Sequence, residues 1–198
     1  MSRPVSHFFA YISRLRWIKR WGLMRNAIDE NVATHSWEVA TLAHALALIR
    51  NEQFGGSVNA DRIAAAALYH DATEVITGDL PTPVKYHSKV MRQAFGDIEH
   101  KAEAELLALL PQHLQNVFAP YVQESALGEE EKKLIKAADR LSAWLKCRAE
   151  VAAGNREFEP AAAQIHRRLT EETLPEVTYF LEVFAPSYDQ PLDNLLSL

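Results

Sequence analysis

The chain has 198 residues, and its 21 Lys and Arg against 26 Asp and Glu give a formal net charge of −5. Apolar residues make up 48% and charged residues 24%, an ordinary globular composition that provides for a sizeable core. The acidic balance argues against broad nucleic-acid binding, which needs a basic surface. The apolar stretches Ile63–Tyr69 and Val39–Ile49 are far shorter than the roughly 20 residues that span a membrane. We therefore expect neither a nucleic-acid partner nor a membrane partner.

The single cysteine, Cys147, excludes a framework of disulfides within the chain. The aromatic run near the N-terminus is interrupted by Ser13 and Arg14, which does not fit a signal peptide. Together these features predict a protein of the reducing cytoplasm.

Apolar residues recur at a helical period along the chain, while alternating runs are nearly absent, so the sequence predicts an all-α protein. Gly78 is placed to close one helix, and Pro81 and Pro83 prevent residues 78–83 from being helical throughout. With no repeat or linker in view, one domain over residues 1–198 is the simplest organisation. The expected helices cover residues 5–20, 31 or 34 to 51, 59–76, 88–110, 112–118, 129–153, 160–171 and 173–184.

Polar residues interrupt the buried stripe of the helix expected at 59–76. Ile63 and Ala67 mark its apolar face, and His70 and Glu74 continue the same face, with Asp71 one position away. Imidazole and carboxylate groups are costly to bury unless they are paired or bind a metal. Together they can hold a divalent transition metal. Taken singly, each residue is more simply explained by a helix end that emerges into solvent.

Two further residues strengthen the metal hypothesis. His35 lies at the start of a helix, and Asp139 lies beside an apolar stripe of the helix expected at 129–153. Alone, Asp139 is more simply a salt-bridge partner of Arg140 or Lys136, or an exposed residue. As a set, two imidazoles and two carboxylates from three helices suit one octahedral metal with open positions for water and substrate.

The order His, His-Asp, Asp resembles the signature of the HD-domain metal-dependent phosphohydrolases. Within that superfamily the chain is most similar to the bacterial 5′-deoxynucleotidases, and the similarity spans nearly its whole length. It implies a single compact HD-type helical bundle over residues 1–198, with core motifs at roughly 30–145. The segments that carry the similarity are Ser6–Ala10, Arg20–Trp21, Leu23–Asn26, Glu30–Val32, Tyr69–Asp71, Thr77–Tyr86 and Ala152–Asn155.

By this resemblance, His35, His70, Asp71 and Asp139 bind one divalent metal ion. Family members prefer cobalt or manganese, and imidazole with carboxylate is compatible with either ion without selecting between them. His35, Asp71 and Asp139 would also border the substrate.

Arg20 and Trp21 are expected at the end of the first helix, inside a local basic cluster. The resemblance assigns Arg20 to the phosphate, which a guanidinium fork matches bidentately. Trp21 would pack against the sugar and exclude a 2′-hydroxyl by size. Without the resemblance, Arg20 is more simply part of a solvated helix face, and Trp21 is equally well a core aromatic.

The loop after Gly78 supplies the other wall of the expected pocket. Asp79 would accept a hydrogen bond from the sugar 3′-hydroxyl, although an Asx turn is its simpler explanation. Leu80, Pro81 and Thr82 would line the same sugar pocket. Glu74 is expected to act as the acid–base residue, either on the attacking water or on the leaving oxygen.

The resemblance thus implies a 5′-deoxynucleotidase that hydrolyses 2′-deoxyribonucleoside 5′-monophosphates to deoxyribonucleoside and phosphate, and discriminates against ribonucleotides. The alternatives are another HD nucleotide phosphohydrolase, acting on deoxynucleoside triphosphates or cyclic nucleotides, or a non-catalytic helical metal-binding scaffold. Family members resemble homodimers. The apolar C-terminal stripe would either supply a dimer contact or form ordinary core; it contains Leu174, Val177, Phe180, Leu181 and Phe184.

Overall fold

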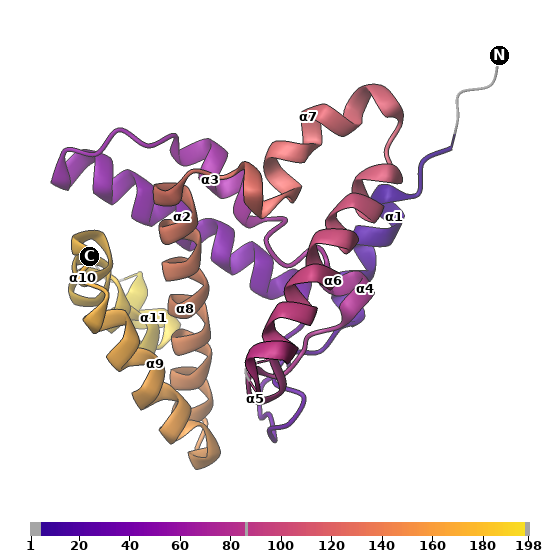
Figure 1. Cartoon of the computed structure of the whole chain (residues 1–198). Helices are drawn as coiled ribbons and strands as arrows, with labels where there is room; N and C mark the ends of the chain where they lie inside the picture. Colours follow the sequence, from indigo (N-terminus) through magenta and orange to yellow (C-terminus); the bar gives the residue numbers. More distant parts are fainter. Residues whose placement is uncertain (1–4, 86, 197–198) are drawn as a thin grey trace.

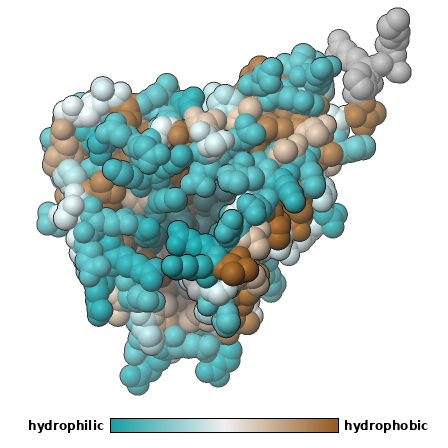
Figure 2. All heavy atoms as spheres, viewed as in Figure 1, coloured by the Kyte–Doolittle hydropathy of each residue, from teal (hydrophilic) through white to brown (hydrophobic). Residues whose placement is uncertain are grey.

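The structure, a computed structural model, describes residues 5–85 and 87–196, and over these residues it is helical (Figure 1). Within this part of the chain there is no strand, and one isolated backbone bridge joins Lys19 and Asn31. The expected all-α class is confirmed. None of the helices described is long and apolar enough to cross a membrane. Figure 2 shows that hydrophilic residues cover most of one face, with apolar residues in scattered groups.

Three long helices dominate: α2 (Val32–Phe54), α6 (Lys89–Ala108) and α8 (Glu129–Ala152). The shorter helices are α1 (Phe8–Ile12), α3 (Ala60–Ala67), α4 (Glu74–Thr77), α5 (Thr82–Lys85), α7 (Gln112–Val122), α9 (Glu159–Glu171), α10 (Pro175–Val183) and α11 (Leu192–Leu195). Short 3₁₀ helices are η1 (Ser13–Trp17), η2 (Glu124–Ala126), η3 (Arg156–Phe158) and η4 (Ala185–Asp189).

The start of α2 is fixed by a capping box. The Asn31 side chain accepts a hydrogen bond from the Thr34 backbone at 3.0 Å, and the Thr34 hydroxyl accepts one from the Asn31 backbone at 3.3 Å. These two bonds satisfy N–H groups that the first turn of a helix leaves without partners. Asn31 is therefore the N-cap, which agrees with the earlier of the two helix starts expected at residues 31 and 34, and it places His35 at a fixed position in the turn that follows.

The first expected helix, at residues 5–20, is wrong in extent. Helix α1 tightens into η1 and ends at Trp17, after which Ile18 is extended. The backbone of residues 18–20 instead bonds to residues 30–32, as in the bond from Val32 to Ile18 at 3.0 Å. Arg20 and Trp21 therefore lie in a loop rather than at a helix end.

The helix expected at 59–76 is also wrong, because it breaks in the middle. Helix α3 ends at Ala67, and α4 begins only at Glu74. Between them the chain makes tight turns, in which the backbone of Ala72 bonds to Tyr69 at 2.9 Å and that of Glu74 bonds to Asp71 at 3.0 Å. The turns let neighbouring side chains point in directions that a continuous helix would not permit.

A smaller error concerns α7, which extends to Val122 and contains Pro120 instead of ending before it. Pro120 lacks the N–H that would close one bond of the last turn, and the helix ends two residues later, at Val122.

Two apolar clusters hold the helices together. The larger one joins α2, α3, α8 and the C-terminal helices, while the smaller one joins α1, α6 and α7 around Ala72. In the C-terminal stripe, Val177 and Phe180 are buried in the larger cluster, and Leu174 and Leu181 pack against it. These four residues are core, as the simpler alternative predicted, whereas Phe184 is 44% exposed.

The loop between η1 and α2 is tied to α8 by the buried carboxylate of Glu150. This carboxylate accepts hydrogen bonds from the backbone of Ala27 at 2.8 Å and of Ile28 at 2.9 Å, and from the Asn155 side chain at 2.7 Å. It also pairs with Lys146, whose ammonium donates to the Ile28 carbonyl as well. The loop that carries Arg20 and Trp21 is therefore fixed at its far end by α8.

Replacing Glu150 with alanine is expected to lower the free energy of unfolding by about 3–5 kcal/mol, because it leaves the Lys146 charge buried without a carboxylate partner. Urea unfolding, monitored by circular dichroism, measures the change. The control is Glu52→Ala, at an exposed position of α2, which is expected to unfold like the wild type. Equal stability of the two variants would contradict the anchoring role.

The same contact gives an acid-dependent stability. Burial alone would raise the pKa of Glu150, but the hydrogen bonds from Lys146 and Asn155 outweigh it and lower the pKa to about 2. Because the folded pKa is below the ordinary value of about 4.3, the contribution is complete above that pH and is lost as the pH falls towards 2.

Candidate active site

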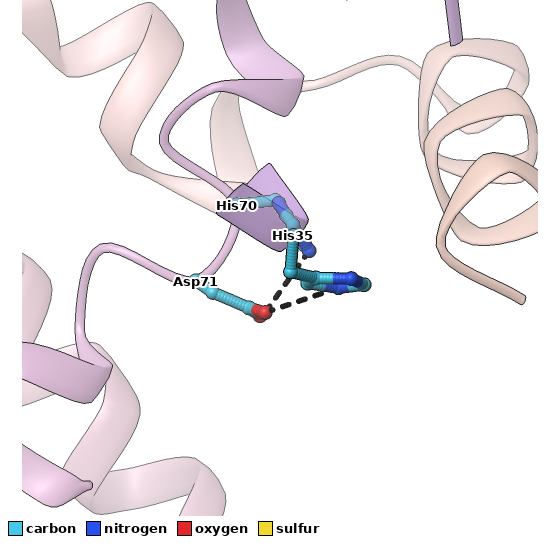
Figure 3. A group of neighbouring side chains, drawn as sticks. All are labelled: His35, His70 and Asp71. Atoms are coloured by element: carbon cyan, nitrogen blue, oxygen red, sulfur yellow. Dashed lines mark ion pairs between the residues drawn. The ribbon is translucent and has the colours of Figure 1, made fainter. Parts of the chain in front are cut away.

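Three helical segments bring the predicted ligands together. His35 comes from α2, while His70 and Asp71 come from the turns between α3 and α4 (Figure 3). One ligand atom from each of these residues lies within 4.8 Å of the other two. Asp139, on α8, reaches the same place, with its Oδ1 3.0 Å from the Nε2 of His35.

Asp71 lies at the centre of the group. Its Oδ2 is 3.1 Å from the Nε2 of His70 and 3.6 Å from the Nε2 of His35. The break between α3 and α4 makes this possible, because His70 and Asp71 are neighbours in sequence and yet both face the same point (Figure 3). Dashed lines in Figure 3 mark these contacts.

Both imidazoles are held through Nδ1 and present Nε2 to the group. The Nδ1 of His70 lies 2.8 Å from the Ala67 carbonyl, and the Nδ1 of His35 lies 3.1 Å from the Ser142 hydroxyl. Both Nε2 atoms are buried, and neither makes a hydrogen bond of good geometry to a described residue, although each lies within 3.1 Å of a carboxylate oxygen. Two buried imidazole nitrogens that face two carboxylates in this way fit a divalent transition metal.

The charges of the group also favour a cation. Burial disfavours the charged imidazole, but the Asp71 carboxylate and then Asp139 outweigh it and raise the pKa of His70 to about 9. Burial likewise works against ionised Asp71 and Asp139, yet the nearby imidazoles hold the pKa of both carboxyls below its ordinary value. Without a metal, protons supply the positive charge that these carboxylates attract; a divalent cation can supply it with neutral imidazoles.

Arg20 borders the ligand group. Its Nη1 lies 3.4 Å from Asp71 Oδ2, and its Nε lies 3.4 Å from Glu30 Oε2. Burial lowers the pKa of Arg20, but the carboxylates of Asp71, Asp139 and Glu30 outweigh burial and raise it. The guanidinium is thus a permanent positive charge beside the place where the ligands converge.

Trp21 is held in an uncommon conformation next to Arg20. Its φ is +59°, a left-handed backbone that is a genuine outlier for a bulky residue. The indole Nε1 donates to Glu30 Oε2 at 2.6 Å, and the ring packs against Phe158 with centroids 5.4 Å apart. A single carboxylate, that of Glu30, therefore orients both Arg20 and Trp21.

Two more predicted residues adjoin this group. Burial, followed by the charges of Asp71 and Asp79, raises the pKa of Glu74 to about 9. Its Oε2 is buried and has no hydrogen-bond partner in the described chain. Burial also raises the pKa of Asp79, although Arg20 and a hydrogen bond from the Trp21 backbone oppose the shift. Glu74 and Asp79 thus lie near enough to Asp71 and Arg20 to interact electrostatically with both.

The other pocket residues expected from the sequence continue this loop. Leu80 and Pro81 follow Asp79 directly and are half-buried, while Thr82 is exposed and begins α5.

Sequence reasoning assigned no role to three residues that contact this group: Glu30, Glu38 and Ser142. Two of them carry a periodic signal, since Glu38 follows His35 by three residues on α2, and Ser142 follows Asp139 by three on α8. Residues three apart share a helix face, so both face the same way as a ligand.

A known family matches most of the chain. A family model described as 5′-deoxynucleotidase YfbR-like matches residues 7–188. The chain belongs to this family. Its members include the 5′-deoxynucleotidase YfbR of Shigella boydii serotype 18, which is 52% identical over 190 residues covering 96% of each chain. The same identity and coverage hold for 5′-deoxynucleotidase YfbR of Escherichia coli O1:K1 / APEC. The resemblance stated from the sequence is confirmed.

Solved structures agree on the fold of this family member. An HD-domain phosphohydrolase from Listeria innocua superposes with a TM-score of 0.80 at 24% identity, covering 92% of this chain and 88% of the other. The cyanophage S-2L HD phosphohydrolase DatZ, solved with dA and one catalytic Zn²⁺ ion, gives a TM-score of 0.59 at 22% identity, covering 87% and 93%. The HD-type helical bundle is therefore shared.

Proposed function

We propose that the protein is a metal-dependent 5′-deoxynucleotidase, which hydrolyses 2′-deoxyribonucleoside 5′-monophosphates to deoxyribonucleoside and phosphate. The observation that carries this proposal is the meeting of two buried imidazole nitrogens, two carboxylates and the Arg20 guanidinium at one point. Membership of the YfbR-like family supports the same substrate class. In this proposal residues 1–198 act as one catalytic domain.

His35, His70, Asp71 and Asp139 are proposed to hold one divalent ion, cobalt or manganese. When bound, the ion supplies an activated water and neutralises charge on the phosphoryl group. Arg20 binds the phosphoryl oxygens with a guanidinium fork that cannot lose its charge, and so keeps the group in line for attack. His35, Asp71 and Asp139 also border the bound phosphate.

The reaction transfers one phosphoryl group to water. A bond forms between the water oxygen and phosphorus, and the bond from phosphorus to the 5′-oxygen breaks. Glu74 is proposed to move the proton, taking it from the attacking water or giving it to the 5′-oxygen. Its raised pKa of about 9 favours the second role, because a carboxyl that holds a proton near neutral pH can give it to the 5′-oxygen.

Sugar selection is proposed to rest on Trp21 and on the loop that faces it. The indole packs beside C2′, where a ribose hydroxyl would clash with it. The hydrogen bond to Glu30 and the packing against Phe158 hold the ring in place, so moving it to admit the hydroxyl would break both contacts. Asp79 accepts a hydrogen bond from the 3′-hydroxyl, and Leu80, Pro81 and Thr82 line the rest of the sugar pocket.

Trp21→Ala is expected to raise the kcat/KM for AMP relative to dAMP by about 10- to 100-fold, the range over which a shape misfit discriminates. The measurement is phosphate release from both nucleotides over a range of concentrations. Trp17→Ala removes an exposed indole from the same segment and is expected to leave the ratio unchanged. Comparable wild-type rates on dAMP and AMP would refute the specificity proposal.

Asp79→Ala separates the two sugar contacts. Because both sugars carry a 3′-hydroxyl, this variant is expected to lower kcat/KM for dAMP and AMP alike. A change in their ratio equal to that of Trp21→Ala would contradict the separate roles.

One assay tests the proposed function itself. Metal-free protein is supplied with Co²⁺, Mn²⁺, Zn²⁺ or Mg²⁺ and offered dAMP, dATP or a cyclic dinucleotide. Phosphate release from dAMP with Co²⁺ or Mn²⁺ is the expected result. Preference for dATP or the cyclic dinucleotide would indicate another HD phosphohydrolase, and metal binding without turnover would indicate a scaffold.

We further propose a cytoplasmic homodimer. The family resemblance supports the dimer, and the buried free thiol of Cys147 supports a reducing compartment. Light scattering after size exclusion measures the mass, which is twice 22.3 kDa for a dimer.

A further inference from the structure

A chain of side chains leads away from His35 on the side opposite the ligand group. Its ring Nδ1 lies 3.1 Å from the Ser142 hydroxyl, and that hydroxyl donates to Glu38 Oε2 at 2.6 Å. The side chains of His35 and Ser142 are fully buried. Glu30 Oε1 is 3.7 Å from the same ring nitrogen, beyond hydrogen-bond distance.

The direction of the protons in this chain follows from donor and acceptor chemistry. An ionised carboxylate only accepts, so the single proton of the Ser142 hydroxyl points to Glu38. The serine oxygen is then left to accept, and His35 donates to it through Nδ1–H. When the ring is neutral, as a metal ligand must be, the Nε2 of His35 therefore presents its lone pair on the side where Asp71, His70 and Asp139 converge.

The second imidazole of the group reaches the same tautomer by a different route. The Nδ1 of His70 donates to the Ala67 carbonyl at 2.8 Å. A backbone carbonyl can only accept a hydrogen bond, so this contact alone fixes the tautomer. His35 depends instead on two side chains, Ser142 and Glu38, which mutation can remove. The tautomer of His35 can therefore be tested by mutation, whereas that of His70 cannot.

The relay also connects two helices at the level of the ligands. Glu38 lies one turn after His35 on α2, and Ser142 lies one turn after Asp139 on α8. The hydrogen bond between Glu38 and Ser142 therefore fixes the two helices that carry His35 and Asp139 relative to each other.

We propose that Ser142 and Glu38 are positioning residues that hold His35 in the tautomer and ring orientation that binds the divalent ion. The inference rests on the metal site of the proposed function, and it assigns the relay a role in metal affinity rather than in the chemical step. Removing such a partner of a ligating histidine typically weakens metal binding by about 10- to 100-fold.

The test measures metal affinity without turnover. Full-length metal-free protein is titrated with Co²⁺ against a chromophoric chelator, for the wild type, Ser142→Ala and Glu38→Ala. Both variants are expected to bind Co²⁺ about 10- to 100-fold more weakly. Ser36→Ala is the matched control. Ser36 is a buried serine like Ser142, but it lies on α2 next to His35, and its hydroxyl has no hydrogen-bond partner in the described chain.

A second readout addresses the tautomer directly. In the Zn²⁺-loaded wild type, imidazole ¹⁵N chemical shifts are expected to show His35 protonated at Nδ1 and bound to the ion through Nε2, and Ser142→Ala at the same Zn²⁺ concentration is expected to show a fraction of His35 unbound. If Ser142→Ala does not fold, Glu38→Ala tests the same relay from its half-buried end.

Wild-type Co²⁺ affinity in either variant, or a His35 ¹⁵N spectrum of Zn²⁺-loaded Ser142→Ala identical to that of the wild type, would overturn the inference. Failure of the proposed function is a separate result, since it would appear as Co²⁺ binding by the wild type with no release of phosphate from dAMP.

Discussion

Replacing His70 or Asp139 with alanine is expected to abolish metal binding and nucleotide hydrolysis together. Each residue is proposed to supply one of four ligands, and the remaining carboxylates and imidazole hold a divalent ion poorly. The metal supplies several kcal/mol of transition-state stabilisation, and each 1.4 kcal/mol or so is tenfold in rate. Activity is therefore expected to fall to about one thousandth of the wild-type rate or less.

The measurement combines metal analysis of the purified variants with phosphate release from dAMP. The chain contains a matched control in a second histidine–aspartate pair, His44 and Asp61, which lie 3.4 Å apart with Asp61 97% exposed. His44→Ala and Asp61→Ala are expected to keep both the metal and the activity. A His70→Ala or Asp139→Ala protein that retained one equivalent of metal would refute the ligand assignment.

Glu74→Gln is expected to keep the metal and to lower kcat by about 10²- to 10⁴-fold, the usual contribution of a general acid or base. Glutamine has nearly the same shape but cannot gain or lose a proton. Unlike the ligands, Glu74 begins α4 after the turn that holds His70 and Asp71, and its buried Oε2 has no partner in the described chain.

Metal content and turnover are measured on the same preparation, with Glu105→Gln, at an exposed position of α6, as the control. Loss of metal from Glu74→Gln would make Glu74 a ligand. Full metal content with unchanged kcat would remove it from the chemistry.

The sequence allowed the fold class and some helix ends to be predicted, because those features depend on local pattern. The helical period predicted the all-α class, and Asn31 and Gly78 predicted where two helices begin and end. His35, His70, Asp71 and Asp139 were expected to converge, and the structure brings them together.

The errors arose where contacts between distant parts of the chain decide the local structure. A continuous helix through His70 satisfies the apolar period, yet tight turns replace it and aim two adjacent side chains at one point. The extended backbone after Trp17 depends on bonds to residues 30–32, which no local pattern signals. The hydrogen bond between Glu38 and Ser142 spans 104 positions. Periodicity places each residue on the same helix face as a ligand, but it does not show that the two residues meet.

The left-handed backbone of Trp21 sets its proposed role in sugar selection against backbone strain at one position. An L-residue with a side chain loses roughly 1–2 kcal/mol in this conformation, whereas glycine adopts it freely. Glycine at position 21 would release that strain, but it would also remove the indole, with its hydrogen bond to Glu30 and its packing against Phe158. Those two contacts therefore hold the strained backbone in place, and loss of either would let the loop relax and turn the indole away from the sugar that it is proposed to meet.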